Sequence, residues 1–317
     1  MRDTPTALPT VSLRQKLFKI WDSDIAYSFR QSPVTMAAAF VVMLIFIGAV
    51  FAPLLATQNP FDPSGLNLMD GKTAPMAVNE FTQNVYVLGT DDQGRDILST
   101  ILYGSRASLL VGFAAVGLAM LIGVTLGLIA GYRGGIIDSI IMRIADIQLT
   151  FPSILVAMLI FGVFRGVLPV QSHAALAVPV LILAIGFSEW PQYARTVRGV
   201  TMVERNKEYV QAARVIGLAP LTIMVRHVLP NVLGPVLVIG TLGLALAIIA
   251  EATLSYLGVG APPTQPSLGT LIRVGQEYIA SGEWWILFFP SITLLALALS
   301  VNLLGDWLRD ALNPKLR

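Results

Sequence analysis

The feature that most constrains this chain is a series of long apolar segments separated by polar ones. A transmembrane helix needs about 20 mostly apolar residues, and six segments of the chain come close to or exceed that length. In lipid a helix satisfies its own backbone hydrogen bonds, so it is the structure that such segments can adopt. We therefore predict an all-α integral membrane protein with six transmembrane helices. The predicted helices are 34–55, 107–130, 136–164, 174–190, 232–256 and 284–304.

The composition agrees with a membrane protein. Of the 317 residues, 55% are hydrophobic and only 13% are charged, whereas about a quarter of the residues of a soluble domain are charged. The net charge of +2 is too small to indicate nucleic-acid binding. The absence of cysteine excludes disulfides and thiolate metal sites. The first apolar run is longer than the ~7–15 apolar residues of a secretory signal, so we interpret it as a retained helix.

The basic residues predict the orientation. With alternating sides, 16 of the 21 Lys and Arg residues lie on the side of the N-terminus and five on the other side. Cytoplasmic loops carry the excess of Lys and Arg, so both termini are predicted to be cytoplasmic. The predicted organisation is a cytoplasmic segment 1–33, a first helix 34–55, an outer loop 56–106, a five-helix core 107–308 and a cytoplasmic tail 309–317.

The cytoplasmic loop 191–231 contains the most informative segment, EYVQAARVIGLAPLTIMVRHVLPN at 208–231. A short helix over 208–216 is predicted to end at Gly217, which can take the left-handed conformation, with Pro220 following where the helix cannot continue. A second short helix is predicted to stop near Pro230. The segment should therefore form a rigid helix–turn–helix between two membrane spans.

This segment resembles the EAA loop of type I ABC importer permeases, in which EAA is followed by three residues, Gly, nine residues and I-x-L-P. In place of the usual Glu and Ile, this chain has Gln211 and His227. In that family the loop docks into a groove on the ATP-binding subunit. The resemblance implies a MetI-like fold and a coupling role for the residues at the matching positions and their neighbour: Tyr209, Gln211, Ala212, Ala213, Gly217, Leu229 and Pro230.

A second motif lies at 87–112 and begins VLGTDDQGRD. Thr90 and Gln93 have the spacing of a capping box, and Asp91 and Arg95 stand at i, i+4. We therefore predict a capped amphipathic helix that leads into the second span. Whether it only caps that span or also contacts substrate stays open. The residues of the candidate motif are Thr90, Asp91, Asp92, Gly94, Arg95 and Asp96.

The motif resembles the LGTDxxGRD segment of the C-type permease of dipeptide, oligopeptide and nickel importers. The ending GDWLRDALNP resembles the GDxLRDxLDP ending of the same subfamily, with Asn313 in place of Asp. Together with the EAA-like segment, these motifs extend the resemblance over most of the chain from about residue 32 onward.

Ionisable residues within membrane spans are expensive and are functional candidates. Glu251 is predicted either to line the translocation path or to pair with a partner subunit. Asp146, also a candidate for the path, is predicted to pair with Arg143 one helical turn away.

Small residues and prolines within the spans predict how the helices pack. Gly123, Gly127 and Gly131 should form a small-residue face for close packing. Four prolines are predicted to kink the last four spans: Pro152, Pro179, Pro235 and Pro290.

No phosphate-binding G-x-x-x-x-G-K-[ST] loop is present in the sequence, so we expect the chain to bind no ATP by that mechanism and no cofactor or metal. The resemblance implies partners that supply what is missing: a B-type second permease, two ATP-binding subunits carrying ATP and Mg²⁺, and a periplasmic solute-binding protein. It also implies the bacterial inner membrane and a subunit without a reaction of its own.

The leading hypothesis for the substrate is di- or oligopeptides. The same resemblance also covers nickel, glutathione and antimicrobial peptides. A secondary transporter or channel is the alternative from another class, but the chain shows no obvious internal repeat of the kind many such transporters carry. A membrane enzyme is disfavoured because the sequence has neither a nucleophile elbow nor a metal-ligand pair.

Overall fold

The computed structural model describes residues 24–262 and 265–312, and these residues are mainly helical. Within these ranges there is no β-strand, only two isolated bridges, Val78–Val85 and Thr90–Asp96. The longer helices are α3 (Pro33–Val50), α5 (Ile97–Arg133), α6 (Gly135–Leu149), α7 (Ser153–Val167), α8 (His173–Glu204), α11 (Leu229–Tyr256), α12 (Leu268–Tyr278) and α13 (Trp285–Leu312). The shorter ones are α2 (Asp24–Gln31), α4 (Ala52–Leu55), α9 (Glu208–Val215), α10 (Pro220–Ile223), the 3₁₀ turns η1 (Pro63–Gly65), η2 (Leu68–Asp70), η3 (Val170–Ser172) and η5 (Ile279–Ser281), and the π-turn η4 (Met224–Val228).

Five helical runs in the described ranges are long and apolar enough to cross a membrane, and α6 with α7 makes a sixth if this bent pair counts as one span. The predicted third span over 136–164 is divided into two helices at the proline predicted to kink it, and α6 and α7 meet at 96°. The break falls at Phe151 and Pro152. Proline disfavours the helical conformation of the residue before it and has no amide hydrogen to donate. Pro179, Pro235 and Pro290, by contrast, lie inside continuous helices.

The second, fourth and sixth spans extend well beyond their predicted ends, and the sixth, α13, continues to Leu312. The second begins at Ile97, ten residues before 107, and the resulting helix α5 has 37 residues. The fourth does not end at Trp190, because α8 continues to Glu204. The first part of the predicted loop 191–231 is thus the last part of a membrane helix, and only 205–228 protrude from the helices.

The glycine face predicted on α5 is confirmed, and it packs against α8. A Cβ added at Gly127 would lie 2.4 Å from the carbonyl oxygen of Ala194 on α8. A Cβ added at Gly123 would lie 2.5 Å from the Cβ of Tyr193. Backbones this close leave no room for a side chain, so the glycines set the α5–α8 distance.

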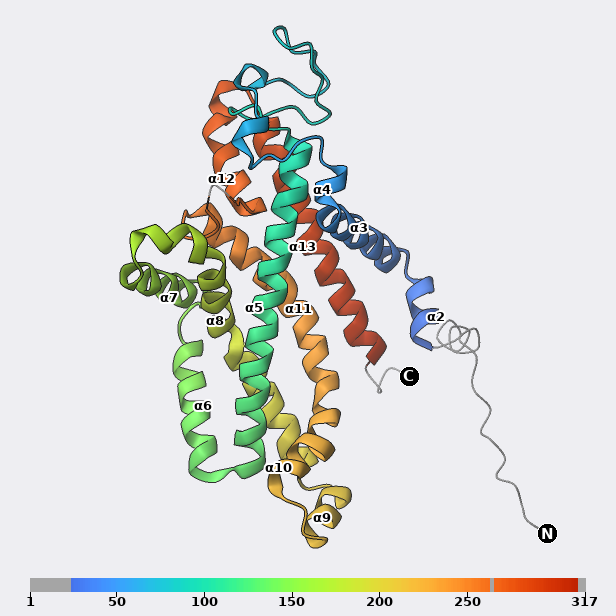
Figure 1. Ribbon diagram of the computed structural model, residues 1–317. Coiled ribbons are helices and arrows are strands. Elements are labelled where there is room, and N and C mark those ends of the chain that lie inside the picture. Colours follow the sequence, from blue (N-terminus) through green and yellow to red (C-terminus); the bar gives the residue numbers. More distant parts are fainter. Residues whose placement is uncertain (1–23, 263–264, 313–317) are drawn as a thin grey trace, which may run out of the picture.

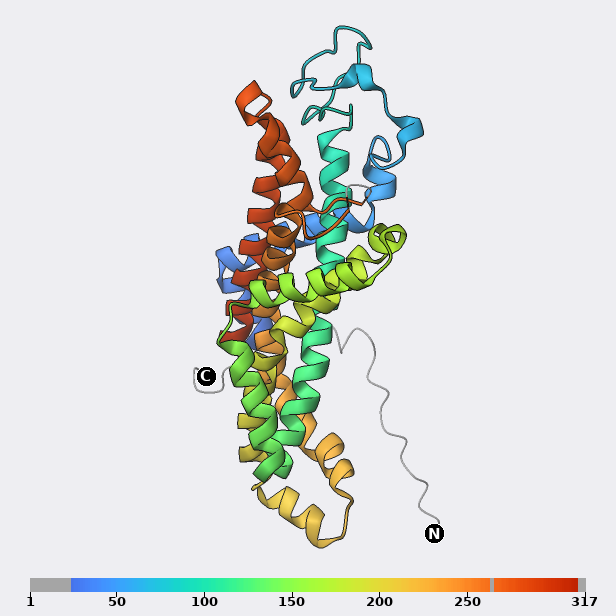
Figure 2. The same cartoon turned by 90° about the vertical axis from the view of Figure 1, so that its left-hand side faces the viewer.

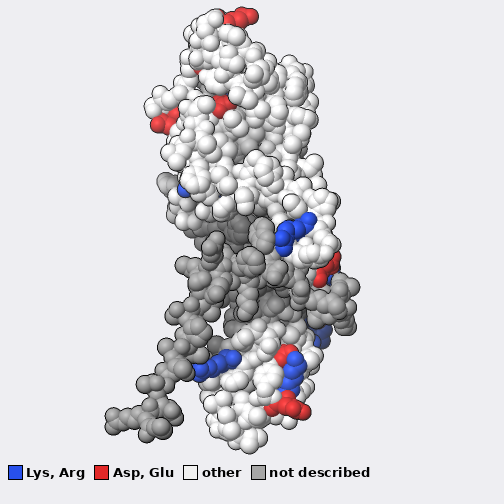
Figure 3. All heavy atoms as spheres, turned by 90° about the vertical axis from the view of Figure 1, so that its right-hand side faces the viewer, with Lys and Arg blue, Asp and Glu red and all other residues white. Residues whose placement is uncertain are grey.

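The overall shape is an elongated bundle with α5 along much of its length (Figure 1). Figures 1 and 2 agree that residues 56–96, which we call the head, lie at one end and that α9 and α10 lie at the other. Figure 3 shows that uncharged side chains cover most of the described surface on one face. The exposed apolar side chains include Phe40, Leu44, Leu121, Leu159 and Leu295, as expected for surfaces that meet lipid or other apolar helices.

Candidate functional site

The protruding segment 205–228, which we call the knob, folds from signals in its own sequence. Helix α9 ends at Val215, and Gly217 just beyond it has a φ of +81°, a conformation that costs glycine little. The amide of Gly217 donates to the Arg214 carbonyl at 3.0 Å, and the amide of Leu218 donates to the Ala213 carbonyl at 3.1 Å. These bonds satisfy carbonyls that the helix end would leave free.

The second half of the knob differs from the prediction. Helix α10 begins at Pro220 and passes through the π-turn η4 directly into α11. The prediction that the helix stops near Pro230 is wrong, because Pro230 lies in the first turn of α11. Pro230 stands where the π-turn passes into α11, directly after the Leu229 amide that donates to the Met224 carbonyl. The knob is therefore continuous with a membrane helix.

The inner face of the knob is part of the protein core. Val210, Ala213, Ile223 and Val228 are at most 4% exposed and pack in one cluster with Val197 of α8. Ala213, one of the residues to which the resemblance gives a coupling role, has its side chain on this inward face. Leu229 is half-buried beside the same cluster.

A polar network ties the knob to the two helices that carry it. The Tyr209 hydroxyl on α9 donates to the Glu204 carboxylate at the end of α8, at 2.5 Å. Lys207 donates to the other oxygen of Glu204 at 2.6 Å, and the Asn231 amide on α11 donates to the Tyr209 hydroxyl at 3.0 Å. Burial, followed by the hydrogen bond to Glu204, raises the pKa of Tyr209 to about 12, so the hydroxyl stays protonated near neutral pH.

The knob is also fixed to the end of α5. The Arg205 guanidinium donates to the carbonyls of Gly131 and Tyr132 at 2.8 and 3.3 Å. The Arg214 guanidinium lies over the Tyr132 ring, 5.2 Å from its centroid. The knob is therefore held by α5, α8 and α11 together, and a displacement of the knob would act on all three.

The outer face of the knob is apolar and exposed. Val215 is 87% exposed, Ile216 73% and Leu221 66%. The predicted coupling residues Tyr209, Gln211, Ala212, Gly217 and Pro230 are exposed as well. The Gln211 side chain donates to the Asn206 carbonyl at 2.9 Å. Exposed apolar side chains gathered at the tip of a rigid projection are typical of a surface that binds a protein partner.

Two ion pairs join α6 to α8, and the sequence did not reveal them. Arg198 binds both carboxylate oxygens of Asp138 at 2.5 and 2.7 Å. Asp146 pairs with Arg195 at 2.5 Å, both with side chains more than half exposed. The predicted pairing of Asp146 with Arg143 is therefore wrong, and the carboxylate of Asp146 serves an interhelical contact.

Glu251 is enclosed by its own chain. Its side chain is 0% exposed, and the Ser255 hydroxyl one turn further along α11 donates to it at 2.7 Å. The Ser255 hydroxyl in turn accepts from the Ala261 amide at 3.1 Å. The expectation that Glu251 lines an open path or faces a partner is therefore wrong in this conformation. Its contact holds the segment after α11 in place.

The motif at 90–96 forms a turn, so the prediction of a helix from Thr90 is wrong. Gly94 has φ +74°, and a Cβ there would lie 2.2 Å from the Asn67 carbonyl oxygen. Asp91 and Arg95 do pair, at 3.7 Å, and the Asp91 carboxylate accepts from the amides of Gln93 and Arg95 at 2.9 Å each. Burial raises the pKa of the Asp91 carboxyl, and these contacts with Arg95 oppose that shift.

The N-terminal cap of α5 is Asp96, not Thr90. Its carboxylate accepts from the amides of Leu98 and Ser99 at 3.3 and 3.1 Å and from the Thr57 hydroxyl at 3.0 Å. The Thr90 carbonyl accepts from the Trp285 indole of α13 at 3.0 Å. These contacts join the head to α5 and α13, which favours a structural role for the motif.

The head has its own polar centre, which the sequence did not reveal. The Asp70 carboxylate is buried and accepts from Asn84 at 3.2 Å, from the Tyr86 hydroxyl at 2.9 Å and from Thr82. Burial and the hydrogen bond to Asp70 raise the pKa of Tyr86 to about 12. The Asp70 carboxylate thus holds together a segment of the head that contains no β-sheet among its described residues.

Apolar spanning helices and a packed knob that continues two of them define a polytopic membrane protein with a rigid projection beyond its spans. The chain belongs to the family described as binding-protein-dependent transport system inner membrane component, which matches residues 123–317. The N-terminal transmembrane domain of oligopeptide transport permease C matches residues 20–75. The family confirms the predicted ABC importer permease and indicates the inner membrane.

Curated relatives match over almost their whole length. The dipeptide transport system permease protein DppC of Haemophilus influenzae is 37% identical over 100% of both chains. The Escherichia coli protein of the same name is 41% identical over 92% of both. The oligopeptide transport system permease protein OppC of Bacillus subtilis is 36% identical over 96% of this chain and 93% of its own.

A solved structure supports the predicted MetI-like fold. An inward-facing structure of the MetNI methionine ABC transporter contains a chain with a TM-score of 0.53 and 20% sequence identity. The match covers 68% of this chain and 96% of that chain. At this identity the likeness shows the fold alone.

Proposed function

We propose that this chain is the transmembrane permease subunit of an ATP-driven importer of di- or oligopeptides. The observation that carries the proposal is the match to dipeptide permeases across the full length of the chain. ATP and Mg²⁺ belong to two separate ATP-binding subunits. A second, B-type permease completes the membrane part, and a periplasmic solute-binding protein delivers the peptide. This chain carries out no reaction of its own.

The knob is the proposed contact with an ATP-binding subunit. Its exposed apolar tip of Val215, Ile216 and Leu221 offers the surface, and its inner face and polar network transmit the motion. Because Glu204, Tyr209 and Asn231 join α8, α9 and α11, closure of the ATPases would move the two membrane helices as one unit. The helices would then alternate access between the two sides of the membrane.

The distribution of Lys and Arg supports the orientation. Both termini and the knob face the cytoplasm, and the head faces the periplasm. Sixteen of the 21 basic residues then lie on the cytoplasmic side, as expected for inner-membrane proteins.

Uptake measurements in a strain lacking this gene test the substrate. We expect uptake of a labelled dipeptide to be lost and to return when the gene is restored, with labelled nickel as the parallel measurement. Loss of nickel uptake alone would contradict the peptide assignment and leave the importer architecture in place. Uptake that persists without any ATPase and follows an ion gradient would contradict the importer itself.

Substitutions of Gly217 test the proposed docking of the knob onto an ATP-binding subunit. A Cβ at Gly217 meets no atom within 4 Å, but its φ of +81° strains any β-branched residue. Gly217→Val should therefore disturb the turn, and Gly217→Asn, which tolerates this conformation, is the matched control. We expect both to reach the membrane, with ATPase co-purification and uptake lost for Val and kept for Asn. Normal uptake with Val would contradict the docking assignment.

A further inference from the structure

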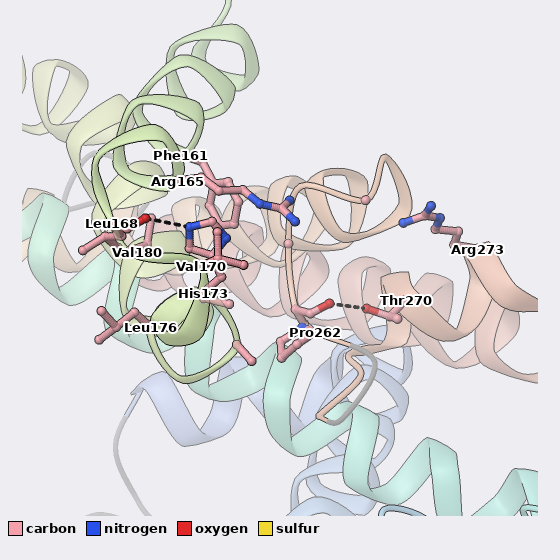
Figure 4. A pocket seen from close by; sticks show the side chains of 15 residues that line it. Phe161, Arg165, Leu168, Val170, His173, Leu176, Val180, Pro262, Thr270 and Arg273 are labelled. Carbon is pink, nitrogen blue, oxygen red and sulfur yellow. Dashed lines mark hydrogen bonds between the residues drawn. The ribbon is translucent and has the colours of Figure 1, made fainter.

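A cavity of about 350 Å³ lies at the head end of the bundle, on the opposite side of the proposed membrane from the knob. Its walls come from the end of α7, the beginning of α8, the loop 258–262 and α12. Figure 4 shows the side chains of these elements converging around the hollow. Ligand sites for small molecules begin at about this size, so the volume suits a short peptide rather than a single ion.

The walls are mainly apolar and the charges are all of one sign. Phe161, Leu168, Leu176 and Val180 are among the apolar residues, and Arg165 and Arg273 are the charged ones. Among the described residues, none that lines the cavity is Asp or Glu. The first turn of the 32-residue helix α8 also borders it, and the N-terminal end of a helix dipole attracts anions. The hollow therefore favours a ligand with an anionic and an apolar part.

Both arginines are free to bind such a ligand. Neither guanidinium has a hydrogen bond or ion pair to any residue within 24–262 and 265–312. Arg165 lies in the last turn of α7, and Arg273 lies across Gly258, where a Cβ would be 2.3 Å from its Nη1. A guanidinium can bind a carboxylate through two parallel hydrogen bonds.

The frame that carries these arginines is held by local hydrogen bonds. The His173 ring nitrogen Nε2 is 2.9 Å from the Leu168 carbonyl oxygen, which closes the connection between α7 and α8. The Thr270 hydroxyl donates to the Ala261 carbonyl at 3.4 Å, which holds the loop onto α12. Figure 4 shows both bonds. The cavity thus lies between two braced elements.

We propose that this cavity is a subsite for the C-terminal end of the transported peptide, with Arg165 and Arg273 binding its α-carboxylate and the apolar wall receiving its last side chain. This assignment rests on the proposed function. A peptide amino terminus does not fit, since it would need a carboxylate that the cavity lining lacks. The site lies on the predicted periplasmic side, where a delivered peptide would first meet this subunit.

Photolabelling of the complete transporter in membrane vesicles tests the subsite. The probe is Ala-p-benzoylphenylalanine, supplied with the solute-binding protein and ATP. We expect the label on residues of α7, α8 or the loop 258–262, read by peptide mass spectrometry. Loss of one charge-assisted hydrogen bond weakens binding by about tenfold, so Arg165→Gln and Arg273→Gln should each lower the labelling about tenfold at subsaturating probe. Arg→Lys at either position should recover part of it.

Arg106→Gln is the matched control, because Arg106 is on the same side of the membrane and does not line this cavity. Labelling elsewhere, unchanged labelling in both Gln variants, or equal labelling by the C-terminal amide of the probe would overturn the subsite. The subsite would also be overturned if the purified Gln variants lost the second permease. It would be overturned as well if native mass spectrometry found an anionic phospholipid that only the wild type retains while the labelling is unchanged. Failure of wild-type vesicles to take up any dipeptide would instead overturn the proposed function. The failure of the subsite and the failure of the proposed function can therefore be told apart.

Discussion

The two ends of this molecule are built in opposite ways. At the knob end, α5 and α8 touch backbone to backbone through Gly123 and Gly127, and Arg205 and Tyr209 add hydrogen bonds across the junction of knob and membrane helices. At the head end, the α7–α8 connection and the loop after α11 leave a cavity of about 350 Å³ between them. The α5–α8 contact leaves no room for a methyl group, whereas the α7–α8 connection and the loop after α11 leave room for a ligand.

The difference indicates how the two ends divide the work of an importer. A lever must move as one body, and interiors packed without voids transmit displacement. At the other end, the bend of 96° between α6 and α7 and the hollow beside α7 interrupt the packing of the helices. Movement applied at the knob should therefore pass through the α5–α8 contact with little loss.

The largest effect is expected from a single methyl group at the α5–α8 contact. Gly127→Ala places a Cβ 2.4 Å from the Ala194 carbonyl oxygen, and overpacking of this kind costs about 1–3 kcal/mol. Gly117→Ala on the same helix meets no atom within 4 Å, so it should leave stability unchanged or raise it by up to about 1 kcal/mol, since alanine favours helix.

Thermal unfolding of the purified transporter in detergent measures both variants. We expect the midpoint to fall for Gly127→Ala and to hold or rise for Gly117→Ala. Equal midpoints for the two variants would mean that the knob end tolerates a wider helix separation, and the contrast between the ends would lose its basis.

A smaller effect is expected at the α6–α8 ion pairs. The Asp138 and Arg198 side chains are 13% and 32% exposed, whereas those of Asp146 and Arg195 are 57% and 54% exposed. Exposed pairs contribute about 0–1 kcal/mol and buried ones cost more when one partner is removed. Asp138→Asn should therefore cost about 1.5 kcal/mol and Asp146→Asn less than about 0.5 kcal/mol. Double-mutant cycles with Arg198→Gln and Arg195→Gln give the coupling, and the reverse order would contradict the reasoning.

Local sequence signals predicted most of the knob. Gly217 and Pro220 mark a turn through their own backbone preferences, and the spacing around Ala212 needs no distant contact to be recognised. The apolar runs likewise predicted the membrane helices, because hydrophobic length is a local property. The glycine face of α5 was visible for the same reason, since its members recur every four residues.

The failures share a different cause. The Asp138–Arg198 and Asp146–Arg195 pairs join residues 60 and 49 positions apart, which a single sequence does not reveal. At Thr90 the capping-box spacing was present, but the tertiary contact of Gly94 with Asn67 required a turn, and Asp96 became the cap. Phe151–Pro152 was visible as a possible kink, but its angle depends on how α7 packs against α8. The cavity, formed by segments almost 100 residues apart, had no local signature.

A modest effect, with a pH dependence of its own, is expected at the polar network of the knob. Tyr209→Phe removes the hydrogen bond to Glu204 and should lower the free energy of unfolding by about 0.5–1.5 kcal/mol at pH 7. Tyr103→Phe is the control, because the Tyr103 hydroxyl has no hydrogen-bond partner in the described residues.

The pKa of Tyr209 is raised to about 12 from about 10 in an unfolded chain. A raised pKa gives stability that is complete below pH 10 and is lost as the pH rises through 12. The difference between wild type and Tyr209→Phe in detergent melting should therefore be equal at pH 7 and 9 and begin to shrink above 10. A difference that already disappears between pH 7 and 9 would show that the Tyr209 hydroxyl does not brace the knob.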